Sequence, residues 1–147
     1  MKIERHEEVL KEVLDEIDSA LNDKRGLVFH QRRLAFILSL GALNILEFYF
    51  HNLNVIKEGV KLNHIWFKRK RQTINEYLQN QITFPIYSIK NIDEILEILI
   101  QIEEKREDLA YGAKSTEEIL QQKINLFFKL KEFLKWLLML VILLLIY

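Results

Sequence analysis

The sequence predicts an all-α fold, and two features of its composition support this prediction. Four glycines and one proline occur in 147 residues, too few for the many turns of a β-sandwich or a doubly wound sheet. Half of the residues are hydrophobic, and apolar side chains recur at helical spacing along most of the chain. We therefore expect a single domain, residues 1–147, folded as an up-and-down bundle of four main helices with a short extra helix.

The first predicted helix covers about 20 residues, carries apolar side chains on one side, and ends at the Asn-Asp-Lys-Arg-Gly turn of residues 22–26. The second, expected over residues 27–57, is apolar on most sides and therefore belongs at the centre of the bundle. Its polar residues recur at steps of three and four and form one stripe: Asn44, Glu47, His51, Asn54 and Glu58. A solvent-facing stripe is the ordinary interpretation, and the lining of a cleft between helices is the alternative.

A basic and aromatic stretch comes next and opens a short helix that is expected to run through Leu78. Its cations follow Trp66 and Phe67 directly and are Lys68, Arg69, Lys70 and Arg71. Such a run is ordinarily a solvated face, but these cations can also neutralise phosphates while Trp66 stacks on an unpaired base. Local nucleic-acid binding is therefore a hypothesis for this stretch. Pro85 then predicts a loop over residues 83–90.

The third strong helix is expected to start at Asn91 or Asp93, either of which can cap it, and to run as far as Gly112. Gly112 suits a left-handed C-terminal cap. Ser115 and Glu118 then have the spacing of a capping box, which predicts the start of the last helix.

The last helix is expected to continue into an apolar tail, residues 136–147, which has no charged side chain. As a helix this tail extends about 18 Å, against about 30 Å for the hydrocarbon core of a bilayer. We expect it to pack against protein, in the bundle or in a dimer interface, and membrane contact through residues 136–147 is the alternative. The first 14 residues include seven charged side chains and no continuous apolar stretch like that of a secretory signal. The expected location is therefore the cytoplasm, with peripheral membrane association as the alternative.

Charge and cysteine content exclude several kinds of site. The 21 basic and 21 acidic side chains cancel, so any basic surface for nucleic acid must be local. The absence of cysteine excludes disulfides, a thiolate nucleophile and cysteine metal ligands. The four histidines show neither an i,i+4 pair nor an H-E-x-x-H motif, so we expect no metal and no cofactor.

The most specific motif lies at the junction between the third and the last predicted helices. It reads Lys105-Arg106-Glu-Asp-Leu-Ala-Tyr111-Gly112. This junction, together with the order of the helices, resembles the HEPN family of small all-helical domains, in which an Arg is followed four to six residues later by a His. Arg106 matches the family Arg, whereas Tyr111 stands where the family His would be, which makes the motif R-x4-Y.

The resemblance implies metal-independent cleavage of RNA in a homodimer, with two motifs facing each other across a cleft. The Arg would stabilise charge on the phosphoryl oxygens, and the His would activate the 2′-hydroxyl or protonate the leaving oxygen. A phenol is protonated at neutral pH, so Tyr111 can donate or position but replaces imidazole poorly as a base. The candidate catalytic residues are Arg106, Tyr111 and Glu47.

The resemblance also implies a biological setting, a toxin–antitoxin or related defence system. In such pairs a minimal nucleotidyltransferase is the antitoxin partner and can modify a tyrosine near the motif, which makes Tyr111 a candidate target.

Three alternatives stay open. Arg106 continues the buried stripe of the third predicted helix, so it can instead form a buried ion pair with Glu47, with Tyr111 as a packing residue. An intact R-x4-H pattern also occurs at Arg25 and His30, but it follows the first helix instead of preceding the last one. The functional alternative is a non-catalytic nucleotide-binding or protein-interaction module.

Overall fold

The computed structural model describes residues 3–57 and 59–146. Within these ranges the regular structure is helical apart from one isolated bridge between Ile56 and Ile82, which confirms the all-α prediction. The elements in chain order are α1 (Ile3–Asn22), η1 (Leu27–His30), α2 (Gln31–Asn52), η2 (His64–Lys68), α3 (Arg71–Gln79), η3 (Ile86–Ser88), α4 (Ile92–Glu103), α5 (Arg106–Tyr111) and α6 (Glu117–Ile146). Glu58 of the predicted polar stripe and Tyr147 of the tail lie outside the described residues.

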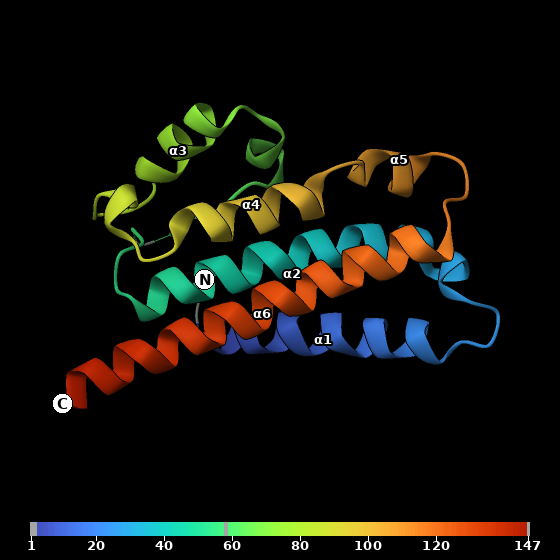
Figure 1. The fold of residues 1–147 in the computed structure, drawn as a ribbon, viewed down its shortest axis with the longest axis horizontal. Coiled ribbons are helices and arrows are strands. Elements are labelled where there is room, and N and C mark those ends of the chain that lie inside the picture. Colours follow the sequence, from blue (N-terminus) through green and yellow to red (C-terminus); the bar gives the residue numbers. More distant parts are fainter. Residues whose placement is uncertain (1–2, 58, 147) are drawn as a thin grey trace.

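The central element is α2, which packs against α1, α4, α5 and α6, while α3 forms an outer excursion next to α4 (Figure 1). Its apolar side chains explain this position, since Leu34, Leu46 and Phe50 are completely buried. Gly41 brings the neighbouring helices close. A Cβ at Gly41 would lie 2.8 Å from the ring of Phe127 on α6 and 2.9 Å from Val13 on α1.

The second predicted helix is shorter than expected, because α2 ends at Asn52 and not at Lys57. Asn54 adopts a left-handed backbone conformation with φ 58°, which the helix cannot continue through. The chain after it pairs with the segment that follows α3: the Thr83 amide donates to the Val55 carbonyl at 2.6 Å, and the Lys57 amide donates to the Gln81 carbonyl at 2.9 Å. This short extended pairing takes over the backbone hydrogen bonds that a longer helix would have made.

Asn44 and Glu47 of the predicted polar stripe are buried, so the interpretation as a solvent face is wrong for these two residues, whereas Asn54 lies beyond α2 and is exposed. His6 of α1 and Asn44 exchange two hydrogen bonds, 2.6 Å between the side chains and 2.9 Å from the Asn44 amide to the His6 carbonyl. The Glu47 carboxylate accepts a hydrogen bond of 2.7 Å from the Leu62 amide. His51 is half-buried, with its ring centroid 5.3 Å from that of His6. Asn44 therefore connects α2 to α1, and Glu47 connects α2 to the backbone at Leu62.

The third predicted helix is divided in two. α4 ends at Glu103, Lys105 is left-handed with φ 60°, and α5 restarts at Arg106. The amine of Lys123 on α6 stabilises this break, because it donates hydrogen bonds to the carbonyls of Gln101 and Glu104 at the end of α4. The break turns Arg106 out of the α4 stripe on which the sequence placed it.

Two predicted helix caps are also wrong. Gly112 is extended, with φ −92° and ψ −166°, and is required for a different reason: a Cβ there would lie 2.5 Å from the Asp108 carbonyl oxygen. The cap of α6 is Thr116, whose hydroxyl accepts a hydrogen bond of 3.2 Å from the Ile119 amide. The Ser115 amide instead donates to the side chain of Gln31 at 2.7 Å, which ties the α5–α6 connection to α2.

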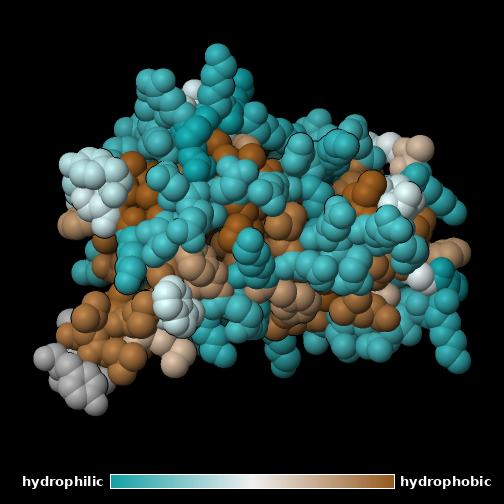
Figure 2. All heavy atoms as spheres, in the orientation of Figure 1, coloured by the Kyte–Doolittle hydropathy of each residue, from teal (hydrophilic) through white to brown (hydrophobic). Residues whose placement is uncertain are grey.

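The apolar end of α6 projects beyond the other helices (Figure 1) and forms a hydrophobic protrusion (Figure 2). Among the side chains that the structure describes, Leu137 is the last fully buried one on α6, at 1% exposure, whereas Leu144 is 76% exposed. The tail therefore packs in the bundle as far as Leu138, and the expectation of packing within the bundle is wrong for Met139, Ile142, Leu143 and Leu144, which are exposed. Packing of these residues in a dimer interface stays a prediction. A second apolar helical stretch, Leu27–Asn52, is long enough to cross a membrane, but 72% of its most apolar window is buried as the centre of this fold.

Candidate functional site

Arg106 opens α5 and carries a guanidinium that no carboxylate of the described chain neutralises within 4 Å. Its Nε atom is buried without a hydrogen-bond partner. The guanidinium carbon lies 5.1 Å from the centre of the Phe36 ring on α2, so the cation is held by stacking on an aromatic face. The ion pair with Glu47 that the sequence offered as an alternative is not formed. A half-buried guanidinium without an anion is a ready binding group for a phosphate.

A pocket of about 360 Å³ opens beside this guanidinium. It lies between α2, the segment that leads into η2, and the start of α5. Three of its side chains are basic, namely Lys61, His64 and Arg106. The remaining lining residues are Phe36, Ser39, Leu40, Leu43, Leu62 and Asn63. The pocket thus combines an apolar wall from α2 with three basic groups from two other elements.

His64 lies beside a buried carboxylate. Glu103, the last residue of α4, is only 3% exposed, and its Oε2 atom lies 3.3 Å from Nδ1 of His64. The other carboxylate oxygen accepts a hydrogen bond from the buried hydroxyl of Ser39 on α2. Oε2 and Nδ1 are both buried without a hydrogen-bond partner, so the contact is a close approach of an imidazole and a carboxylate and not a formed hydrogen bond. Ser39, Glu103 and His64 thus lie in a row from the core to the pocket.

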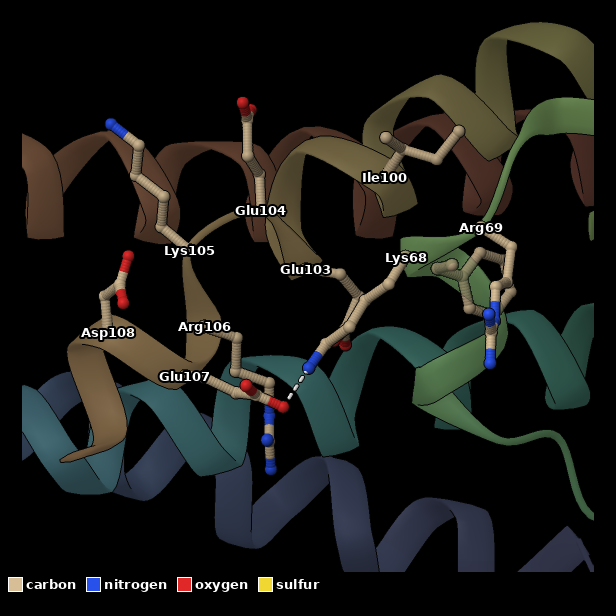
Figure 3. A pocket seen from close by; sticks show the side chains of 10 residues that line it. Lys68, Arg69, Ile100, Glu103, Glu104, Lys105, Arg106, Glu107 and Asp108 are labelled. Atoms are coloured by element: carbon tan, nitrogen blue, oxygen red, sulfur yellow. Dashed lines mark hydrogen bonds and ion pairs between the residues drawn. The ribbon is translucent and has the colours of Figure 1, made fainter. Parts of the chain in front are cut away.

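A second hollow, of about 430 Å³, lies on the other side of Arg106, between η2 and the α4–α5 break (Figure 3). In this view Arg106 points toward α2, whereas Glu104 and Lys105 point the opposite way. Lys68 crosses the hollow and pairs with Glu107, and this contact holds the pKa of the Glu107 carboxyl below its usual range. The hollow is mixed in charge, so it is a weaker anion site than the pocket at His64.

Tyr111 and Glu47 do not join Arg106 in one pocket. Tyr111 is 72% exposed, and its ring meets the edge of Phe36 at 5.9 Å between centroids. Phe36 is thus the shared contact of Arg106 and Tyr111. Glu47 is buried under Leu62, and its desolvation raises the pKa of the Glu47 carboxyl. Glu47 belongs to the packing of α2, while Tyr111 stands at the surface beside the pocket.

The basic run is divided between different contacts. Lys68 pairs with Glu107, and Arg71 donates to the Asp93 carbonyl at 2.8 Å. The run thus leaves Arg69 and Lys70 exposed between two paired neighbours. Trp66 is stacked on Tyr77, with ring centroids 5.5 Å apart, so one face of its ring is occupied by the protein.

The residues of the second motif, Arg25 and His30, form ion pairs within and beside the turn after α1. Both ring nitrogens of the buried His30 contact carboxylates, 2.8 Å to Asp23 and 3.0 Å to Glu16. Arg25 pairs with the same Asp23 at 2.8 Å, and its hydrogen bonds hold the pKa of that carboxyl well below its usual range. Neither ring nitrogen of His30 is left for a substrate, so these contacts assign the pair to the stability of the turn.

The sequence found Arg106 but missed His64, Glu103, Ser39 and Phe36. They come from three elements, and no local motif marks them. The only local signal is Asn63, whose side chain accepts a hydrogen bond of 3.0 Å from the Ile65 amide and caps η2, which fixes the backbone at His64. Among the described residues, no group of three His, Asp or Glu side chains has the arrangement of a metal site.

Comparison with known proteins adds no relative. No family model matches the sequence, no curated protein matches it, and no solved structure matches the fold. The function must therefore be argued from the geometry of the site.

Proposed function

We propose that this protein is a metal-independent endoribonuclease whose active site is the pocket between Arg106 and His64. One observation carries the proposal: an unneutralised guanidinium and an imidazole that lies 3.3 Å from a buried carboxylate line the same pocket. This pairing of a fixed cation with a proton-transfer group suits cleavage of a phosphodiester. The resemblance of the Arg106 motif to HEPN domains supports the same reaction class and a role in a toxin–antitoxin or defence system.

The proposed reaction uses the 2′-hydroxyl of RNA as the nucleophile. Nε2 of His64 accepts the hydroxyl proton, the 2′-oxygen attacks phosphorus, and the bond from phosphorus to the 5′-oxygen breaks. The products are a 2′,3′-cyclic phosphate and a 5′-hydroxyl end, whose leaving oxygen takes up a proton from water, and the imidazolium of His64 then gives its proton back to the solvent. Arg106 donates hydrogen bonds to the non-bridging oxygens as their charge grows. Lys61 adds a positive charge that draws the phosphate into the pocket.

Tyr111 takes a different part in this proposal from the one that the motif spacing gives it. Its exposed ring stands beside the pocket on Phe36, where it is available to a base of the bound RNA. Exposure also makes its hydroxyl accessible to a modifying enzyme, which supports Tyr111 as the target of a nucleotidyltransferase partner. Co-expression with such a partner should add a nucleotide mass to the tryptic peptide that contains Tyr111.

The test is cleavage of a single-stranded RNA by the purified protein in excess EDTA. We expect products with 2′,3′-cyclic phosphate ends, and losses of at least about 100-fold for Arg106→Ala and for His64→Ala. Lys11→Ala, an exposed cation on α1, is the matched control and should cleave at the wild-type rate. Circular dichroism establishes that each variant is folded. Equal cleavage by the wild type and both pocket variants would place any activity elsewhere.

Binding without cleavage is the outcome that favours a second candidate, a non-catalytic nucleotide-binding module. The observation on its side is that Tyr111, not His, stands in the motif and lies outside the pocket. In that case nucleotide binding would depend on Arg106, and His64→Ala would weaken it only slightly.

A further inference from the structure

The end of α6 exposes a run of apolar side chains, while Leu137 and Leu138 still pack against the bundle. From Trp136 to Leu144 every residue is apolar, and the exposed ones are Trp136, Met139, Ile142, Leu143 and Leu144. At about 100° per residue these five positions cover more than half of the helix circumference. An exposed apolar surface of this kind marks an interaction site.

The distribution around the helix argues for a lipid environment as the occupant. A second helix, from this chain or another, covers a stripe of roughly 100° and would leave the opposite apolar side chains in water. Hydrocarbon surrounds a helix on all sides. A helix that is apolar all round is therefore matched to acyl chains better than to one partner helix.

The residues before the protrusion have the character of a membrane interface. Three lysines and one glutamate precede Trp136 on α6: Lys129, Lys131, Glu132 and Lys135. Lysines at this boundary extend their amines to anionic headgroups, and tryptophan prefers the headgroup level. The lysines, then Trp136, then the apolar residues thus follow one another along α6 in the order of the layers of a bilayer, from the charged headgroups to the hydrocarbon core.

A second element lies at the same end of the long axis of the molecule, the η3 turn (Figure 1). Tyr87 on this turn is 82% exposed, and Phe84, two residues before the turn, is 47% exposed. Aromatic side chains at this end of the molecule would add contact with the headgroup region.

We propose that the α6 protrusion, residues 139–146, inserts into the hydrocarbon region of a lipid bilayer, with Trp136 at the headgroup level, and docks the helical domain on an anionic membrane surface. The residues from Met139 to Ile146 extend about 12 Å along the helix axis, enough to reach beyond the headgroups into the hydrocarbon core. The lysines before Trp136 then lie among the headgroups. This proposal does not depend on the ribonuclease proposal, because no residue of the pocket takes part in it.

Vesicle flotation of the full chain tests the proposal, with phosphatidylcholine vesicles and with vesicles that also contain phosphatidylserine. We expect wild-type protein to float with both and to bind the anionic vesicles more tightly, in a salt-sensitive manner. Replacing Met139, Ile142 and Leu144 together with Gln should weaken binding by at least about 100-fold. Leu21→Gln with Phe29→Gln, which changes exposed apolar residues elsewhere, is the matched control and should bind as the wild type does.

Fluorescence distinguishes insertion from adsorption. In a Trp66→Phe background Trp136 is the sole tryptophan, and its emission should shift to the blue with vesicles and be quenched by brominated acyl chains. Wild-type binding by the triple variant would overturn the proposal. So would a protein that fails to bind vesicles and instead sediments as a dimer that the triple variant dissociates, since that result assigns the protrusion to a second copy.

Discussion

Oε2 of Glu103 lies 3.3 Å from Nδ1 of His64, at the place where α4 ends and the pocket begins. The carboxylate is buried, and Ser39 donates a hydrogen bond to its other oxygen. A buried carboxylate needs such partners, because desolvation without them costs several kcal/mol. The hydroxyl of Ser39 therefore stabilises one oxygen of Glu103, while Oε2 and Nδ1 of His64 lie side by side in the interior without a hydrogen-bond partner.

The variant Glu103→Gln tests whether the Glu103 carboxylate orients the His64 imidazole. The variant keeps the size of the side chain and can still accept the Ser39 hydrogen bond, but it loses the charge that favours the Nδ1 proton. We expect kcat for RNA cleavage to fall about 100-fold with KM nearly unchanged, because His64 would no longer be held in the active tautomer. Steady-state kinetics on a labelled RNA measure both constants. A rise in KM with kcat unchanged would show that Glu103 affects binding of the RNA and not proton transfer.

The stacking of Arg106 on Phe36 leads to a second prediction. Phe36→Leu removes the aromatic face while keeping an apolar side chain, so Arg106 loses about 0.5–2 kcal/mol of cation–π stabilisation. We expect RNA binding to weaken by about 2–30-fold, which corresponds to that range. Arg106→Lys keeps the charge but loses the planar fork, and should reduce kcat more than binding. Equal effects of both variants on binding alone would contradict a role of Arg106 in the transition state.

Periodicity predicted the long helices well because their burial patterns are local. α1 ends at Asn22 as its turn residues indicate, and α2 is central as its all-round apolarity indicates. The ends of elements were less predictable, since they depend on distant partners. Lys105 is left-handed without being glycine, and the Lys123 amine that stabilises this break comes from another helix.

The candidate site was half predictable for the same reason. Arg106 belongs to a short motif that can be read along the chain, whereas His64 reaches the pocket only because η2 folds back against α4. The burial of Asn44 and Glu47 was likewise hidden, because their partners His6 and Leu62 lie far away in the sequence. A polar stripe on a helix does not reveal whether water or protein covers it.

For Gly41→Ala, the sign of the change in the free energy of unfolding distinguishes between two effects, helix propensity and close packing. Alanine is the better helix former by about 1 kcal/mol, so helix propensity alone would make Gly41→Ala stabilising. A Cβ at this position would instead lie 2.8 Å from Phe127 and 2.9 Å from Val13, which forces α1 and α6 apart. We expect a net loss of about 1–2 kcal/mol in the free energy of unfolding, measured by urea denaturation. A stabilised variant would disprove the close approach of the three helices.

Lys123 provides a prediction about the position of Arg106. Lys123→Met keeps the apolar stem but removes the hydrogen bonds to the Gln101 and Glu104 carbonyls. We expect a loss of about 1–3 kcal/mol in the free energy of unfolding, because two carbonyls at the end of α4 lose their donor. RNA cleavage should fall as well, since the break at Lys105 places Arg106. Lys129→Met, on the same helix but without such bonds to α4, is the control for stability and activity.

Glu47 gives the protein a pH dependence whose sign follows from burial. Desolvation raises the pKa of the Glu47 carboxyl in the folded state, so the folded state binds the proton more tightly than the unfolded state does. Stability from this group is therefore greatest at low pH, and falls as pH rises from the unfolded pKa through the raised folded pKa.

Glu47→Gln should remove this dependence while keeping an acceptor for the Leu62 amide. The stability of the variant relative to the wild type should thus increase between pH 4 and pH 7 in urea denaturation. Glu8→Gln, at an exposed position on α1, should show no such increase. If the difference between the Glu47→Gln variant and the wild type were constant over this range, the buried carboxyl would not be titrating. A smaller relative stability at pH 7 would mean that Glu47 is stabilised as an anion, contrary to its burial beneath Leu62.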